Sequence, residues 1–207
     1  MKPLYPRTLA LAAALAFSNS AWAHHPIGGE TPSTLWQGLL SGLGHPIIGI
    51  DHLAFIVAIG LLSAFARLRS PVFPLALVAA TVLGASLQWS GVTLPYVETL
   101  VAASVVVAGL LVFRSPKQLK TVGIASSLAA VFHGMAYGEA IIGAEPAPLG
   151  AYLLGFSMIQ MAIAGLAFTA GHWALRNGPS VLRITRGLSA SAISGIGLIA
   201  LSTTVLA

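Results

Sequence analysis

The stretch GIDHLAFIVAIGLLSAFARLR (Gly49–Arg69) contains an apolar run of membrane-spanning length that ends in two arginines. A helix rises 1.5 Å per residue, so residues 49–66 would extend about 27 Å, close to the ~30 Å hydrocarbon core of a bilayer. Asp51 and His52 stand near the start of this run, where an ionisable side chain is costly to desolvate unless it is paired or bound. The stretch therefore predicts a transmembrane helix that begins in a polar site.

The rest of the chain has the same apolar character. Of its 207 residues, 57% are hydrophobic and 7% are charged, whereas a soluble domain has about 25% charged residues. Five further runs of spanning length are Pro71–Trp89, Leu94–Phe113, Thr121–Glu139, Gly150–Leu175 and Gly187–Ala207. We therefore expect an all-α fold, a bundle of about six transmembrane helices that forms one domain over residues 47–207.

The N-terminal segment is typical of a secretory signal peptide. Lys2 and Arg7 precede a short apolar core, and Ala21-Trp22-Ala23 supplies the small residues of a cleavage site. We expect residues 1–23 to be removed. Residues 24–46 would then form a periplasmic tail and a short interfacial helix over 34–43, which Gly44-His45-Pro46 would end.

Basic side chains beyond the signal segment are confined to alternate connections. They follow the first, third and fifth runs, as Arg67, Arg69, Arg114, Lys117, Lys120, Arg176, Arg183 and Arg186. Because positively charged connections stay on the cytoplasmic side, this alternation predicts a multi-pass protein of the bacterial inner (cytoplasmic) membrane with both mature termini in the periplasm, N-out and C-out. The acidic residues then lie on or near the periplasmic side, where they attract cations.

Composition excludes several classes of function. The chain has no cysteine, which excludes disulfides, thiolate metal sites and cysteine nucleophiles. It also lacks the glycine-rich phosphate loop of ATP-binding proteins. Its basic residues are few and separated by long apolar runs, which argues against nucleic acid and leaves the lipid bilayer as its surroundings.

Two polar clusters, HPIIGIDH (His45–His52) and FHGMAYGE (Phe132–Glu139), carry ligand-type side chains. Because the first and fourth spans run in opposite directions, both clusters fall at a similar depth in the outer half of the membrane. Imidazole and carboxylate together suit nickel, cobalt, copper(II), zinc or iron(II). The predicted metal site comprises His45, Asp51, His52, His133 and Glu139. Weaker candidates for contact with the ion are His24, His25, Met135, Tyr137 and Gln160.

Each cluster also has a purely structural interpretation. The alternative for Asp51 is that it caps its helix, with the two neighbouring histidines in interfacial water. The alternative for the second cluster is that Gly134 and Gly138 form a small-residue packing face beside a buried His133. Both interpretations stay open at the level of sequence.

The combination of H-x5-D-H at His45–His52 with F-H-G-x-A at Phe132–Ala136 resembles the HupE/UreJ family of nickel-permease-like membrane proteins. The resemblance covers essentially the whole mature chain with its six spans, and it extends to the presence of a cleaved signal before it. It implies passage of nickel(II), which is supplied to the maturation proteins of hydrogenase or urease. It also implies that the His and Asp side chains of the first motif are important for transport, with the His of the second motif contributing to the site.

The chain departs from the family pattern in the second motif. Family members often continue it as A-H-G-x-E, whereas here Tyr137 replaces the second His and Glu139 comes one position early. The loss of one imidazole leaves the identity of the metal open among nickel, cobalt, copper and zinc.

We expect a non-enzymatic importer of a divalent transition metal, with nickel(II) as the first choice. A doubly charged ion moving inward across about 100 mV gains about 4.6 kcal/mol, which sustains roughly a two-thousand-fold accumulation without ATP. The alternatives are a cobalt or copper transporter on the same scaffold, and an intramembrane zinc hydrolase with Glu139 as general base. A membrane protein that senses or holds metal without moving it is a third class.

Overall fold

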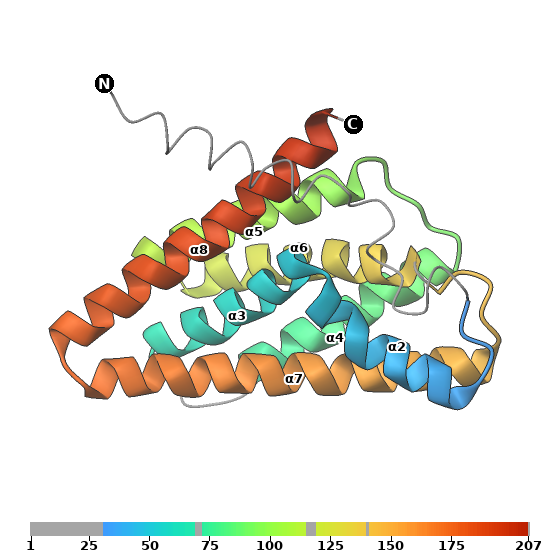
Figure 1. Cartoon of the computed structure of the whole chain (residues 1–207), viewed down its shortest axis with the longest axis horizontal. Coiled ribbons are helices and arrows are strands. Elements are labelled where there is room, and N and C mark those ends of the chain that lie inside the picture. Colours follow the sequence, from blue (N-terminus) through green and yellow to red (C-terminus); the bar gives the residue numbers. More distant parts are fainter. Residues whose placement is uncertain (1–30, 69–71, 115–118, 140, 207) are drawn as a thin grey trace, which may run out of the picture.

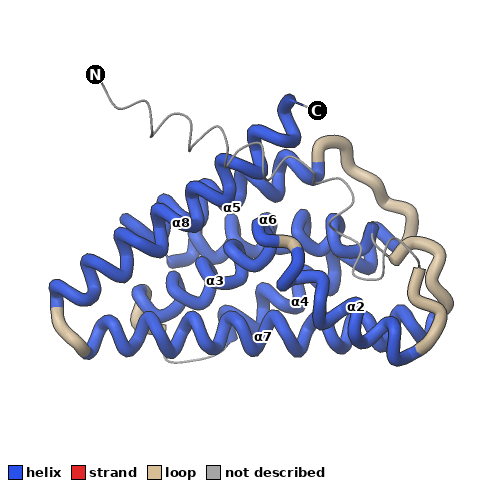
Figure 2. Tube along the Cα trace, in the orientation of Figure 1, coloured by secondary structure: helices blue, strands red, loops and turns tan. Residues whose placement is uncertain are grey.

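The computed structural model describes residues 31–68, 72–114, 119–139 and 141–206, and all regular structure in these ranges is helical. The helices are α2 (Leu35–Ile48), α3 (Ile50–Phe65), α4 (Val72–Trp89), α5 (Val97–Arg114), α6 (Leu119–Glu139), α7 (Pro146–Arg176) and α8 (Pro179–Leu206) (Figure 1). They pack side by side as a bundle (Figure 2). The expected all-α fold is thus confirmed for this part of the chain. The predicted signal segment 1–23 and the histidines at 24 and 25 lie outside the described residues.

Each of the six predicted spans coincides with one of the helices α3 to α8. The largest shift is in α8, which begins at Pro179 instead of Gly187. By length and composition, α5, α7 and α8 can each cross a bilayer alone, and α2 with α3 forms a fourth candidate if the bent pair counts as one span. The chain is therefore a membrane protein with apolar helices, and the number of six crossings stays a prediction.

The start of the bundle differs from the sequence-based expectation. α2 does not end at Gly44-His45-Pro46 but continues to Ile48, and α3 then leaves at an angle of 79° (Figure 1). The predicted stop is wrong because packing against α7 holds this segment helical. Gly38 and Gly42 lie so close to the α7 backbone that a side chain at either position would clash with it.

α3 is the central helix of the bundle. It contacts α5, α7 and α8 along its length, while α4 packs mainly on α6 and α5 packs mainly on α8. Twelve of its 16 residues are buried, as expected for a helix that is apolar on every side. The break between α2 and α3 therefore brings polar side chains into the interior of the bundle.

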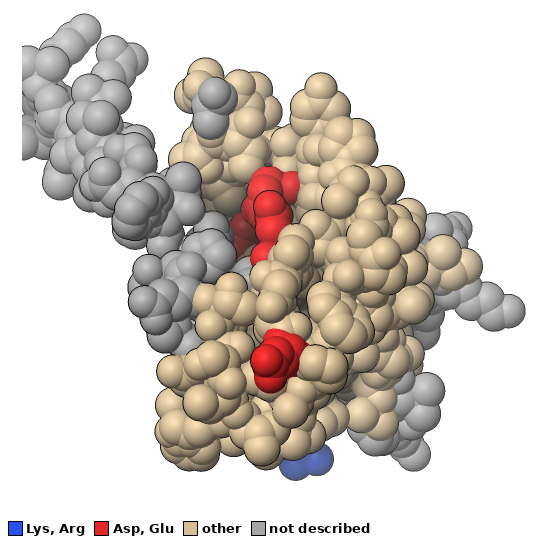
Figure 3. Space-filling model, turned by 90° about the vertical axis from the view of Figure 1, so that its right-hand side faces the viewer, with Lys and Arg blue, Asp and Glu red and all other residues tan. Residues whose placement is uncertain are grey.

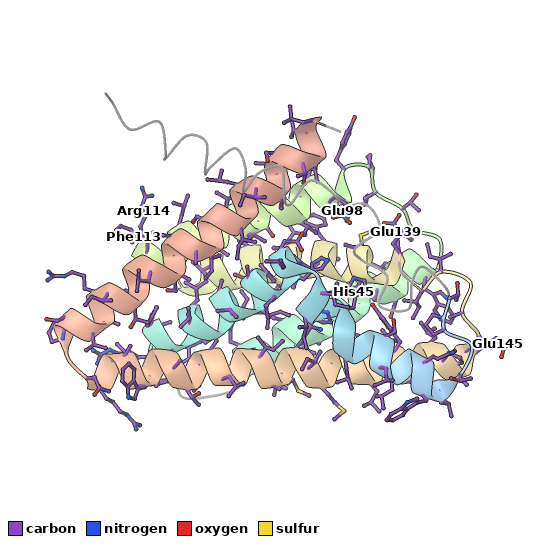
Figure 4. The ribbon with its side chains drawn as sticks, viewed as in Figure 1. His45, Glu98, Phe113, Arg114, Glu139 and Glu145 are labelled. Carbon is purple, nitrogen blue, oxygen red and sulfur yellow. The ribbon has the colours of Figure 1, made fainter. Side chains whose placement is uncertain are left out.

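Three acidic side chains lie toward the same end of the bundle. Arg114 lies at one end, whereas Glu98, Glu139 and Glu145 lie toward the other (Figure 4). Viewed from that second end, the surface shows two acidic groups, one of them in a recess, and a small basic patch only at its lower border (Figure 3). An ion that approaches the acidic end meets a field that favours cations.

Candidate metal site

Three histidines from different helices converge beside the bend between α2 and α3. His45 comes from α2, His52 from α3 and His133 from α6, and each is only 1% exposed. The ring centroids of His45 and His52 lie 5.8 Å apart, and those of His52 and His133 lie 5.1 Å apart. The structure thus brings together side chains from both sequence motifs.

The bend itself is built by Gly49 and Asp51. Gly49 is the N-cap of α3 in an extended conformation, and a side chain there would lie 2.6 Å from Cδ2 of His52. Asp51 stands in the first turn of α3, where its Oδ1 accepts the backbone N–H of His52 at 2.8 Å. A carboxylate in this position is stabilised by the positive end of the helix dipole. The half-buried Asp51 therefore has a structural role beside any role in ion binding.

His133 is fixed through both of its ring nitrogens. Its Nδ1 lies 2.9 Å from Nδ1 of His52, and its Nε2 lies 2.9 Å from the hydroxyl of Ser104 on α5. Phe55 stacks on its ring with centroids 4.0 Å apart. The next residue, Gly134, lies against the backbone of Thr81 on α4, so a side chain there would clash. The small-residue packing face proposed from the sequence is therefore present, and it places His133 at the site.

His45 is held by a tyrosine that sequence reasoning missed. The hydroxyl of the fully buried Tyr152 on α7 lies 3.0 Å from Nδ1 of His45 and donates to the backbone carbonyl of Tyr137 at 3.0 Å. The ring of Tyr152 stacks on Phe156. Tyr152 thus connects α2, α6 and α7 around the site.

Tyr137 lies between the two histidines of the first motif. Its ring centroid is 4.3 Å from that of His52 and 5.0 Å from that of His45. Its hydroxyl is buried and has no hydrogen-bond partner among the described residues. A buried hydroxyl without a partner costs about 1–3 kcal/mol, so this atom marks a place where a ligand would be stabilised.

The other predicted site residues lie around this cluster. Glu139 is exposed at the C-terminal end of α6, and Met135 is buried. Gln160 is buried and donates to the Thr81 hydroxyl at 3.1 Å. Within the described ranges, no group of three or more His, Asp and Glu side chains is arranged to hold a metal ion. The site is therefore a hydrogen-bonded cluster and not a closed metal cage.

The comparison with protein families decides the class of the chain. The family model of HupE / UreJ proteins matches residues 11–200. The chain belongs to the HupE/UreJ family. Protein HupE of Rhizobium leguminosarum bv. viciae is 32% identical over 136 residues, which cover 65% of this chain and 68% of that protein. No solved structure matches the chain.

The family assignment confirms the resemblance drawn from the two motifs. HupE/UreJ proteins are associated with nickel and cobalt transport, and this agrees with a transporter better than with a zinc hydrolase. The residues that sequence reasoning missed in this HupE/UreJ protein are Ser104, Tyr152, Thr81 and Phe55. Their only signal in the sequence is a single hydroxyl or ring within an apolar run, which has no informative spacing.

Proposed function

We propose that this HupE/UreJ protein is an inner-membrane permease that admits a divalent transition-metal ion, nickel(II) in the first place, from the periplasm to the cytoplasm. The observation that supports the proposal best is the buried pair of His45 and His52 at a broken helix, close to the acidic end of the bundle. Each of the two imidazoles is bonded to a residue of another helix, so together they form an ordered polar site inside an apolar bundle, where polar side chains are typically functional.

The spacing of these two rings is close to that of two ligands of one ion. Two imidazoles whose nitrogens lie about 2.1 Å from the same ion, at an angle of about 90–110°, have ring centroids roughly 4.5–5.5 Å apart. The rings of His45 and His52 are 5.8 Å apart, so they would move slightly closer when the ion binds. The ion would thus bind between α2 and α3, with Asp51 adding negative charge and His133 bonded to His52 from α6.

Side chains above and below this pair would form the route of the ion. We assign the exposed Glu139 to capture at the periplasmic mouth, because an exposed carboxylate attracts cations without holding them tightly. The ring of Tyr137 lies beside both imidazoles, and its unpartnered hydroxyl would bond a water molecule carried by the ion or contact the ion directly. Gln160 with its partner Thr81 is the adjacent polar pair on α7 and α4.

The arrangement suits passage better than storage. Conduction needs binding that is strong enough to admit the ion and weak enough to release it. Two imidazoles and one nearby carboxylate are fewer ligands than a structural four-ligand site has. The cargo would serve maturation of hydrogenase or urease, and Tyr137 in place of a second-motif imidazole leaves cobalt, copper and zinc as competitors for the site.

The proposal is tested by measuring metal uptake into cells that express the chain. The metals are radioactive nickel, cobalt and zinc, together with copper. We expect His45→Ala, Asp51→Ala and His133→Ala each to cut nickel uptake at least tenfold at near-normal membrane abundance. His172→Ala is the control, because His172 on α7 is half-buried against Phe168 and has no place in the site. Normal uptake by all three site variants would refute the proposed site.

Purified protein in proteoliposomes separates a permease from the other two classes. A permease accumulates nickel inside the vesicles when the interior is negative. A zinc hydrolase or a metal sensor would accumulate none, and that result would refute the proposed function.

A further inference from the structure

The hydrogen bonds around the three histidines determine which of their nitrogens can bind a metal ion. A neutral imidazole has one N–H and one lone pair, and only the lone pair is a ligand. The proton positions follow from the heavy-atom contacts, because a hydroxyl has one proton and a backbone carbonyl only accepts.

Ser104 sets the proton on His133. Its Oγ lies 2.7 Å from the carbonyl oxygen of Val101 and 2.9 Å from Nε2 of His133. The serine proton must point to the carbonyl, since two oxygens without a proton between them repel at this distance. His133 then donates from Nε2 to Ser104, and its lone pair is on Nδ1.

The same reasoning passes from His133 to His52. Their Nδ1 atoms are 2.9 Å apart, so one of them carries the shared proton. Because Nδ1 of His133 holds the lone pair, His52 is the donor. The lone pair of His52 is therefore on Nε2.

Tyr152 sets the proton on His45 in an equivalent way. Its hydroxyl donates to the carbonyl oxygen of Tyr137 at 3.0 Å, so it must accept from Nδ1 of His45, which is also 3.0 Å away. The lone pair of His45 is then on Nε2, as it is in His52.

We propose that Ser104 and Tyr152 are positioning residues that fix the tautomers of the histidine cluster, so that His45 and His52 both present Nε2 to the ion. Each hydroxyl is anchored on a backbone carbonyl of a packed helix, so the arrangement is set before an ion arrives. Such outer contacts orient ligating imidazoles and raise their affinity. The part of this inference that concerns the ion rests on the proposed function.

The tautomers are measured directly by nitrogen NMR on full-length protein labelled with 15N-histidine and stripped of metal by a chelator. Single His→Gln variants assign the signals. We expect His133 to carry its proton on Nε2, and His45 and His52 to carry theirs on Nδ1. A proton on Nδ1 of His133 or on Nε2 of His45 would overturn the inference.

Nickel uptake kinetics of Ser104→Ala and Tyr152→Phe test the role in transport. We expect each variant to raise the half-saturating nickel concentration about tenfold, within the 10–100-fold range of outer-contact losses, at unchanged membrane abundance. Ser104→Thr should restore the wild-type value, because threonine keeps a hydroxyl that can bond the carbonyl one turn earlier. Ser189→Ala is the matched control, since Ser189 on α8 is also half-buried and bonded to a helix carbonyl, with no hydrogen bond to a histidine in the described part of the chain.

The two measurements fail independently. If the wild-type chain moves no metal, the proposed function is refuted, while the NMR result still decides the tautomers. If the wild type transports nickel and both hydroxyl variants match it in half-saturation, the positioning role is refuted although the permease stands.

Discussion

Nδ1 of His52 lies 2.9 Å from Nδ1 of His133, although the two residues are 81 positions apart in the chain. This contact joins the start of α3, immediately after the break between α2 and α3, to α6. The helix that α6 packs on most extensively is α4. Phe55, less than one turn after His52, covers the ring of His133. The two histidines are therefore held as one unit, which Phe55 on α3 and Ser104 on α5 support.

A unit of this kind predicts non-additive loss of function. We expect His52→Ala and His133→Ala each to reduce the initial rate of nickel uptake at least tenfold, and the double variant to be little worse than either single one. The reason is that removing one partner already disorders the other. Losses that multiply in the double variant would show that the two side chains act separately.

Tyr137 offers a variant that separates binding from stability. Tyr137→Phe removes a buried hydroxyl that has no partner among the described residues. The free energy of unfolding should stay the same or rise by about 1 kcal/mol, because an unsatisfied polar group is lost. The half-saturating nickel concentration should rise several-fold, since the ion loses a polar neighbour. Chemical denaturation and uptake kinetics of the same preparation measure both, and unchanged kinetics would exclude the hydroxyl from the route.

Tyr137→His tests the origin of metal preference. It places an imidazole beside the rings of His45 and His52, at the position where the family resemblance implies a second histidine. We expect tighter nickel binding with slower release, hence a lower half-saturating concentration and a lower maximal rate. The change in metal preference is measured by how strongly cobalt, copper and zinc inhibit nickel uptake. If cobalt, copper and zinc inhibit nickel uptake by the variant as strongly as they inhibit uptake by the wild type, Tyr137 does not determine which metal is preferred.

The close contact of α2 with α7 predicts a sharp difference between glycines. Gly42→Ala places a methyl group against the backbone of Tyr152 and should lower stability by about 3 kcal/mol or abolish membrane accumulation. Gly165→Ala on α7 meets nothing within 4 Å and should be neutral or stabilising by up to about 1 kcal/mol. Thermal unfolding in detergent compares the two, and equal melting temperatures would contradict the close packing of α2.

The membrane potential should drive accumulation in proportion to the charge of the ion. In proteoliposomes with a potassium gradient and valinomycin, about 60 mV should support roughly a hundred-fold nickel accumulation, because two charges gain about 2.8 kcal/mol. Accumulation that follows a proton gradient instead, with no effect of potential, would show coupling to protons and not simple passage.

The helices were predictable from the sequence, and the geometry of the site was only partly so. The runs behind α3 to α8 are long and apolar, and paired motifs brought His45, His52 and His133 into one candidate site. The course of α2 was not predictable, because Gly44-His45-Pro46 is a local stop signal that only the α7 backbone overrides. Ser104 and Tyr152 were missed for a similar reason. Their partners come from other helices, and no spacing along the chain records such contacts.

Because the helix is interrupted at Gly49, backbone groups at the break also contribute to attracting the ion. α2 stops beside the histidines, and the last carbonyl groups of a helix carry partial negative charge that favours a cation. The opening turn of α3 carries the opposite partial charge at the same place, and the carboxylate of Asp51 neutralises it. A neutral residue at position 51 would therefore leave the ion facing a positive helix terminus, so the aspartate acts as an electrostatic shield even if it never touches the metal.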